Sequence, residues 1–125
     1  ACESLENVDG LANLPNLTTL DLSHCNIKNV DGLANLTSLT QLHLNYCIAL
    51  NNIDGLANLT NLTELTIAGG SPVDDLNSLV NLPNLTILFL EGMESFHSDL
   101  EGHDLDMYDR QTVSDFQEFI KILEF

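Results

Sequence analysis

The segment Leu56-Ala-Asn-Leu-Thr-Asn-Leu-Thr-Glu-Leu65 decides the fold, because near copies of it occur at three other places in the chain. The copies begin at residues 11, 33, 56 and 79, so successive starts lie 22, 23 and 23 residues apart. Self-similarity with a fixed period of about 20–50 residues is the signature of proteins built from stacked repeats. The sequence therefore predicts a solenoid, in which each repeat buries its apolar side against its neighbours.

Each copy contains apolar residues in the spacing L-x-x-L-x-L. They are Leu17, Leu20 and Leu22; Leu39, Leu42 and Leu44; Leu62, Leu65 and Ile67; and Leu85, Leu88 and Leu90. The final L-x-L has a period of two, which is typical of a strand with one buried face. We expect parallel strands near residues 18–23, 41–45, 63–68 and 86–91.

An aspartate precedes the apolar turn of several repeats, at Asp9, Asp31 and Asp54. A carboxylate at the start of a helical turn accepts hydrogen bonds from free backbone N–H groups. We therefore expect short helical or 3₁₀ segments, capped by these aspartates, on the side opposite the strands. The predicted fold class is an α/β solenoid, a right-handed superhelix with a parallel concave β-sheet and short convex segments.

This pattern resembles the leucine-rich-repeat family, and residues 54–65 are most similar to its short-repeat, internalin-like bacterial subclass. The turn position departs from the Asn usual in the family, because it holds Cys25, Cys47, Gly70 and Met93. The resemblance implies protein recognition without catalysis. It slightly favours a secreted or cell-surface location, and it names no partner.

The chain divides at about residue 96. Residues 1–96 hold about four repeats and a partial N-terminal unit, and residues 97–125 form an acidic loop and a helix. The helix is expected to start at Ser114-Asp115, and its apolar stripe is Phe116, Phe119, Ile120 and Leu123. We expect this helix to cap the last repeat, since the end of a solenoid needs a cover. Docking of the helix into a partner is the alternative.

The charge of the chain limits its partners. It has 19 acidic and three basic residues, a formal net charge of −16. Phosphate backbones and anionic lipids need a basic surface, so we expect no nucleic-acid binding. No apolar run approaches the roughly 18 residues of a membrane span, so we expect no membrane insertion. Basic protein surfaces and divalent cations would be attracted, although acidity can also serve solubility alone.

The sequence offers little for catalysis. It contains no glycine-rich phosphate loop, nucleophile elbow or HExxH motif, so we expect no enzyme and no cofactor. Cys25 and Cys47 occupy equivalent turn positions and are expected to stack as buried neighbours. The odd third cysteine, Cys2, leaves the redox state open.

The acidic loop near the C-terminus is a candidate site for a divalent cation. Its carboxylates are dense enough for a divalent cation, although they lack the register of an EF-hand. The candidate ligands are Asp99, Glu101, Asp104, Asp106 and Asp109, with His97 and His103. A solvated acidic loop without metal is the alternative.

The candidate binding surface is the concave face of the sheet. Residues that alternate with the buried leucines must point outward there. They form three rows, which are Thr19, Gln41, Glu64 and Ile87; Asp21, His43, Thr66 and Phe89; and Ser23, Asn45, Ala68 and Glu91. Tyr46 lies where the second strand enters its turn.

Two residues in these rows, Ile87 and Phe89, are large and apolar where the pattern requires exposure. The C-terminal segment could cover them, they could be a hot spot for a partner, or the register could be shifted. We expect a module that binds a basic or mixed apolar and basic protein surface. The alternative is a structural spacer or regulatory segment of a larger bacterial surface or effector protein.

Overall fold

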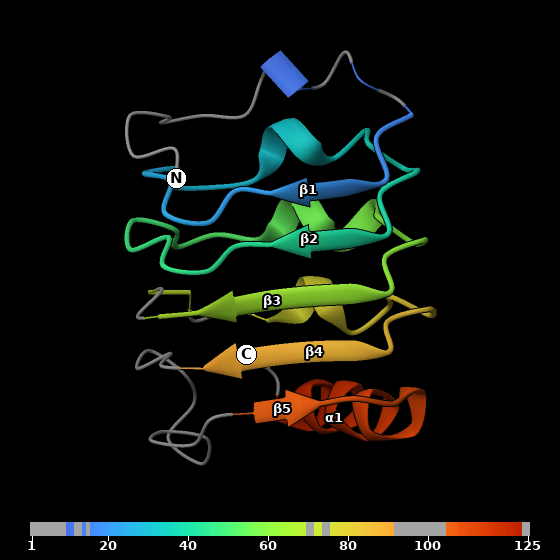
Figure 1. Cartoon of the computed structure of the whole chain (residues 1–125). Helices are drawn as coiled ribbons and strands as arrows, with labels where there is room; N and C mark the ends of the chain where they lie inside the picture. Colours follow the sequence, from blue (N-terminus) through green and yellow to red (C-terminus); the bar gives the residue numbers. More distant parts are fainter. Residues whose placement is uncertain are drawn as a thin grey trace.

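The structure, a computed structural model, describes residues 10–11, 14, 16–69, 72–73, 76–91 and 105–123. Within these residues the repeats supply four parallel strands, β1 (Thr19–Asp21), β2 (Gln41–His43), β3 (Glu64–Ala68) and β4 (Ile87–Glu91). The strands follow one another across a single sheet in the order of the sequence (Figure 1). The predicted strands and their parallel pairing are confirmed.

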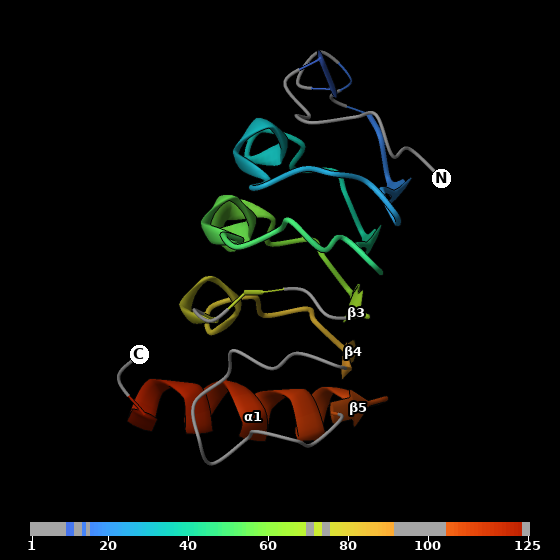
Figure 2. The same ribbon diagram turned by 90° about the vertical axis from the view of Figure 1, so that its left-hand side faces the viewer.

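Short 3₁₀ segments form the opposite side of the array. They are η2 (Asp31–Leu33), η3 (Asp54–Asn58) and η4 (Asn77–Leu79), and Figure 2 shows them stacked behind the sheet. The apolar side chains of the repeat fill the space between the two layers. In the second repeat Leu36, Leu39, Leu42 and Leu44 are all fully buried. The predicted solenoid is confirmed.

The repeats join through aligned hydrogen bonds as well as through the leucines. Thr40 N–H donates to Thr18 O at 2.7 Å, and Thr63 N–H donates to Thr40 O at 2.8 Å. The hydroxyls of Thr40 and Thr63 donate to the same carbonyls, at 3.1 and 3.0 Å. Farther round the coil, Asn84 Nδ2 donates to Thr60 O at 2.9 Å. The repeated Asn-Leu-Thr therefore stabilises the stacking.

Asparagines, and not the predicted aspartates, accept the bonds at the starts of the 3₁₀ segments. Asp31 N–H donates to Asn29 Oδ1 at 3.1 Å, and Asp54 N–H donates to Asn52 Oδ1 at 2.8 Å. Neither segment has a side-chain cap from the expected position. The aspartate prediction was wrong because each turn begins at the aspartate itself, and the asparagine two residues earlier is in reach. Asp9 lies outside the described residues.

The C-terminal segment adds a fifth strand and a helix. Strand β5 (Leu105–Met107) pairs antiparallel with β4, which the sequence did not predict. Helix α1 (Arg110–Leu123) begins four residues before the expected Ser114. It starts there because Asp109 Oδ1 accepts a hydrogen bond from Thr112 N–H at 2.8 Å, which makes Asp109 the helix cap.

Helix α1 lies across the end of the array, next to β4 and η4 (Figure 2). Val113, Phe116 and Ile120 are buried, and Phe119 packs against the core while partly exposed. The side chain of Leu123, the last residue of the predicted stripe, lies outside the described part. The described part of the stripe therefore faces the last repeat, as expected for a cap.

We expect the cap residue Asp109 to make stability depend on pH. The hydrogen bond from Thr112 lowers the pKa of Asp109 below its ordinary value of 3.8. A lowered folded-state pKa stabilises the fold above the unfolded pKa, and the effect disappears as pH falls through the folded value. Asp109→Ala should lower the thermal midpoint at neutral pH, and its difference from wild type should narrow below pH 3.8.

Thermal unfolding followed by circular dichroism at a series of pH values measures this effect. Asp115→Ala, at an exposed aspartate farther along α1, is the matched control. A difference between wild type and Asp109→Ala that stays constant down to the lowest pH would contradict the assigned cap.

Candidate functional site

The predicted rows of outward side chains lie in register across the four parallel strands. Thr19 pairs with Gln41, Gln41 with Glu64, and Glu64 with Ile87. The next row is Asp21, His43, Thr66 and Phe89, also paired in order. In the third row Ala68 pairs with Glu91, and Asn45 N–H donates to Ser23 Oγ at 3.2 Å. The side chain of Glu91 lies outside the described part.

A polar network occupies the centre of this face. His43 Nε2 lies 3.1 Å from a Glu64 carboxylate oxygen, and His43 Nδ1 lies 2.9 Å from Thr66 Oγ1. Thr66 is buried although its row faces outward, and its hydroxyl contacts the imidazole of His43. The hydroxyl of Thr66 can donate to or accept from His43 Nδ1. The network orders Glu64 toward the middle of the sheet.

Asp21 supplies a second carboxylate beside His43 on the neighbouring strand. Its Oδ1 accepts a hydrogen bond from Ser23 N–H at 2.9 Å. Bonds from Ser23 lower the pKa of Asp21, and His43 contributes to the same direction. Asp21 is exposed, and its lowered pKa favours the ionised form, so it places a negative charge on the concave face.

The apolar end of the face is flanked by the C-terminal segment. β5 lies beside β4, with Phe89 paired to Asp106. The rings of Phe89 and Tyr108 meet edge to face at 5.0 Å, and both Ile87 and Phe89 are half-buried. The segment therefore covers part of the patch and adds Tyr108, itself 66% exposed, to its rim. Sequence reasoning missed Tyr108, since the pairing of β5 is a tertiary contact.

The turns that follow β1 and β2 carry an unusual backbone. His24 and Tyr46, in equivalent positions, have φ of 63° and 59°. Residues with a Cβ pay about 1–2 kcal/mol in this left-handed region. The equivalent residue of the third repeat is Gly69, with φ of 84°. The first two of these repeats therefore have an aromatic ring at this position. The third has glycine, the residue type that adopts a left-handed backbone without strain.

The side chains of these turn residues form a stack. The His24 and Tyr46 rings lie 4.8 Å apart and 14° from parallel. Gly69 makes room for the Tyr46 ring, because a Cβ there would come within 2.2 Å of Tyr46 Cδ1. Tyr46 was predicted as a contact residue, whereas the sequence indicated nothing about the stack. One feature of the sequence did indicate the unusual backbone at this position, namely the glycine at the equivalent position of the third repeat.

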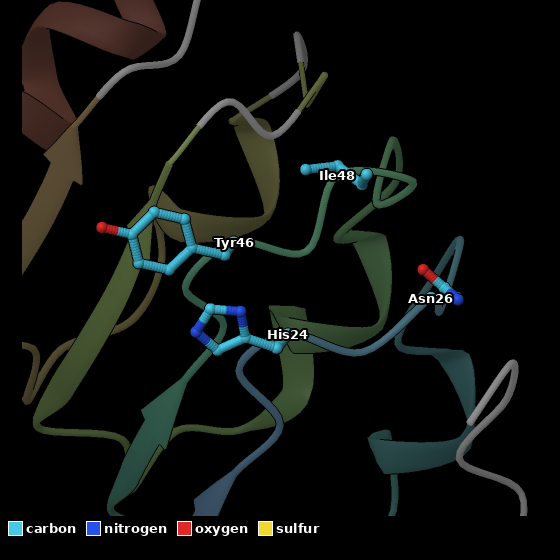
Figure 3. A pocket seen from close by; sticks show the side chains of 4 residues that line it. All are labelled: His24, Asn26, Tyr46 and Ile48. Carbon is cyan, nitrogen blue, oxygen red and sulfur yellow. The ribbon is translucent and has the colours of Figure 1, made fainter. Parts of the chain in front are cut away.

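A hollow of about 300 Å³ lies beside the stack, lined by His24, Asn26, Tyr46 and Ile48. Figure 3 shows the four side chains around it, two from each of two successive turns. We call these four residues the turn-edge patch. Tyr46 is 54% and Ile48 67% exposed, although both are large and apolar over most of their surface.

Cys25 and Cys47, which follow His24 and Tyr46 directly in the chain, are buried. The Cys47 thiol donates to Leu22 O at 3.1 Å. Burial raises the pKa of Cys47 above its ordinary value of 9.0, which disfavours the nucleophilic thiolate. Both positions therefore serve packing, as the sequence predicted. Cys2 lies outside the described residues.

The candidate cation loop lies almost wholly outside the described residues, which exclude Asp99, Glu101 and Asp104. Asp106 belongs to β5, and Asp109 caps α1. In the part of the chain that is described, no group of three His, Cys, Asp or Glu residues could hold a metal ion. Within the same part, no helix has the length and apolarity that crossing a membrane requires.

The open sheet backed by short 3₁₀ segments defines a solenoid repeat protein with an accessible strand face. Residues 15–58 match the family model described as Leucine Rich repeats (2 copies). This match and the observed fold confirm the predicted resemblance to leucine-rich-repeat proteins. Leucine-rich repeats are generally protein-interaction modules. No curated protein matches the chain.

The chain is also similar to two solved internalin structures from Listeria monocytogenes. With an internalin C2 it shares 28% identity and a TM-score of 0.45, over 78% of this chain and 53% of that one. With a second internalin it shares 21% identity and a TM-score of 0.33, over 74% of this chain and 45% of that one. The chain thus spans about half the length of each.

Proposed function

We propose that the chain binds a protein partner on the concave face of β1–β4. The observation that carries the proposal is the combination of an ordered polar centre, made by His43 and Glu64, with the half-buried apolar pair Ile87 and Phe89 at one end. A spacer needs no apolar side chains on its open face, so this combination favours binding. The proposal assigns recognition, and no catalytic step, to this chain.

The partner's chemistry follows from the charges on the face. Asp21 and Glu64 are carboxylates on either side of His43, and the whole chain has net charge −16. Complementary charge speeds encounter and selects partners more than it raises affinity. We therefore propose a partner with an apolar contact centre and Lys or Arg at its rim. Gln41, Thr19, Ser23 and Asn45 supply polar contacts nearby.

Affinity capture with the intact chain, followed by identification and titration of the captured protein, tests this function. The double variant Phe89→Ala and Ile87→Ser should weaken binding about 10–30-fold, because a few large side chains that become buried in an interface carry most of its energy. The convex pair Asn35→Ala and Asn58→Ala, both at exposed positions, is the control and should bind as wild type does.

Removing the Phe89 ring also removes the partner of Tyr108, so the fold must be checked by circular dichroism and thermal melting. Tyr108→Ser offers a second variant that leaves β4 intact, and it should weaken binding in the same direction. Wild-type affinity in both the double variant and Tyr108→Ser would rule out this end of the concave face.

A further inference from the structure

The turn-edge patch stands apart from the concave rows and from the capping helix. Among the described residues, the large apolar side chains that are clearly exposed are Leu14, Tyr46, Ile48 and Tyr108. Tyr108 already packs on Phe89, and Leu14 does not line the hollow described above. Tyr46 and Ile48 instead line one hollow together with His24 and Asn26. Large exposed apolar groups gathered at a hollow mark interaction sites more often than scattered ones do.

The packing of the patch holds its rings in place before any partner arrives. His24 stacks on one side of Tyr46, and the backbone of Gly69 lies against the ring as well. Both ring-bearing residues keep a left-handed backbone that the third repeat gives to glycine. Rigid aromatic side chains lose little freedom on binding, which is why they serve as anchors in interfaces.

Charge indicates what could occupy the hollow. Asp21 is ionised and bonded to Ser23, next to His24 in the chain. Of the three basic residues in the sequence, Arg110 and Lys121 lie on α1 at the other end of the array, and Lys28 follows Asn26 by two positions. A hollow with two apolar side chains, on a chain of net charge −16, complements an apolar side chain with cationic neighbours.

We propose that the turn-edge patch is a second protein-binding site, which takes a bulky apolar side chain flanked by Lys or Arg in a partner segment. The apolar side chain enters the hollow between the His24–Tyr46 stack and Ile48, and the flanking cations lie toward Asp21. Asp21 is close to both sites, because it lies three residues before His24 and pairs with His43 in the sheet. The hollow itself is lined by residues of the turns after β1 and β2, whereas the concave-face proposal rests on His43, Glu64, Ile87 and Phe89. The second site therefore does not depend on the concave-face proposal.

Fluorescence anisotropy with labelled peptides tests the site on the full chain. The probe carries a tryptophan between pairs of arginines, and two reference peptides replace either the tryptophan or the arginines by serine. The wild-type chain should bind the probe about tenfold or more tightly than either reference, since the site requires both features. Equal binding of the peptide without tryptophan would overturn the proposal, as would failure to bind the probe.

The protein variants locate the site. Tyr46→Asn removes the ring but keeps a residue that tolerates the left-handed backbone, so it should fold. Tyr46→Asn and Ile48→Ser should each weaken probe binding about tenfold or more. Tyr46→Phe should bind as wild type does, because it keeps the apolar ring. Leu14→Ser, at an exposed apolar residue outside the hollow and 47% exposed, is the matched control.

Two results would contradict the location. One is full probe binding by folded Tyr46→Asn and Ile48→Ser, which would place the peptide elsewhere on the acidic surface. The other is an equal loss in Leu14→Ser, which would indicate general apolar adhesion. The concave-face proposal is tested separately, by measuring how the Phe89 and Ile87 double variant binds the captured partner.

Discussion

Replacing Ile120 by alanine is expected to lower the free energy of unfolding of the whole array by about 2–5 kcal/mol, the range for truncating a buried isoleucine. Ile120 is fully buried in α1, the helix that covers the last repeat. The truncation would leave a cavity between α1 and the last repeat. The side chains around it could relax only partly to fill that cavity. Each repeat is stabilised by its neighbours, so the loss should reach β1 and not α1 alone.

Denaturant unfolding followed by circular dichroism measures this loss as a lower midpoint. Glu118→Ala, at an exposed position on the same helix, is the matched control and should change stability little. Phe119→Ala should fall between the two, because that side chain is only partly buried. An unchanged midpoint in Ile120→Ala would mean that α1 does not stabilise the repeats.

The repeat array was predictable from the sequence because one periodic pattern specifies it several times. Leucines at fixed spacing must share one face, and a shift by one residue would turn that whole face outward. This is why Leu42, Leu65 and Leu88 pair across the strands as the pattern required. The rows of outward side chains follow from the same register, which is why their positions could be named in advance.

The C-terminal end was less predictable because it occurs only once and has no repeat to compare. Strand β5 is three residues long and follows an acidic segment, so no local pattern indicates a strand. It forms because the edge of β4 offers unpaired backbone groups, which is a tertiary cause. The helix start was misplaced for a similar reason, since both Asp109 and Ser114 are suitable caps and packing decides between them.

The turn-edge patch shows a different limit. A left-handed backbone at His24 and Tyr46 does not follow from the residue types, because only a few per cent of residues other than glycine adopt it. Comparison among the repeats could have suggested it, since Gly69 occupies the same position. The stack itself depends on the distance between successive turns, which only the assembled solenoid determines.

The polar contacts between helix α1 and the last repeat lead to the second prediction with a large expected effect on stability. Gln117 Nε2 donates to Leu79 O at 2.7 Å and to Leu82 O at 3.0 Å, and its side chain is only 3% exposed. Arg110 donates to Gln117 Oε1 at 2.9 Å and to Leu85 O at 2.8 Å. Gln117 and Arg110 thus donate hydrogen bonds to backbone carbonyls on the outer side of the last repeat. In the described part of the chain no further repeat packs against that side.

Gln117→Leu is therefore expected to lower the free energy of unfolding by about 2–3 kcal/mol, because it removes three hydrogen bonds of a buried side chain, one of them with the charged Arg110. Leucine fills similar space but donates nothing to Leu79 and Leu82, and Arg110 loses an acceptor. Gln111→Leu is the matched control, because Gln111 is exposed and bonds only Asp115 among the contacts described. Denaturant midpoints compare the two variants. If Gln117→Leu proves as stable as Gln111→Leu, apolar contact alone holds the cap, and the bonds to the repeat carbonyls contribute nothing measurable.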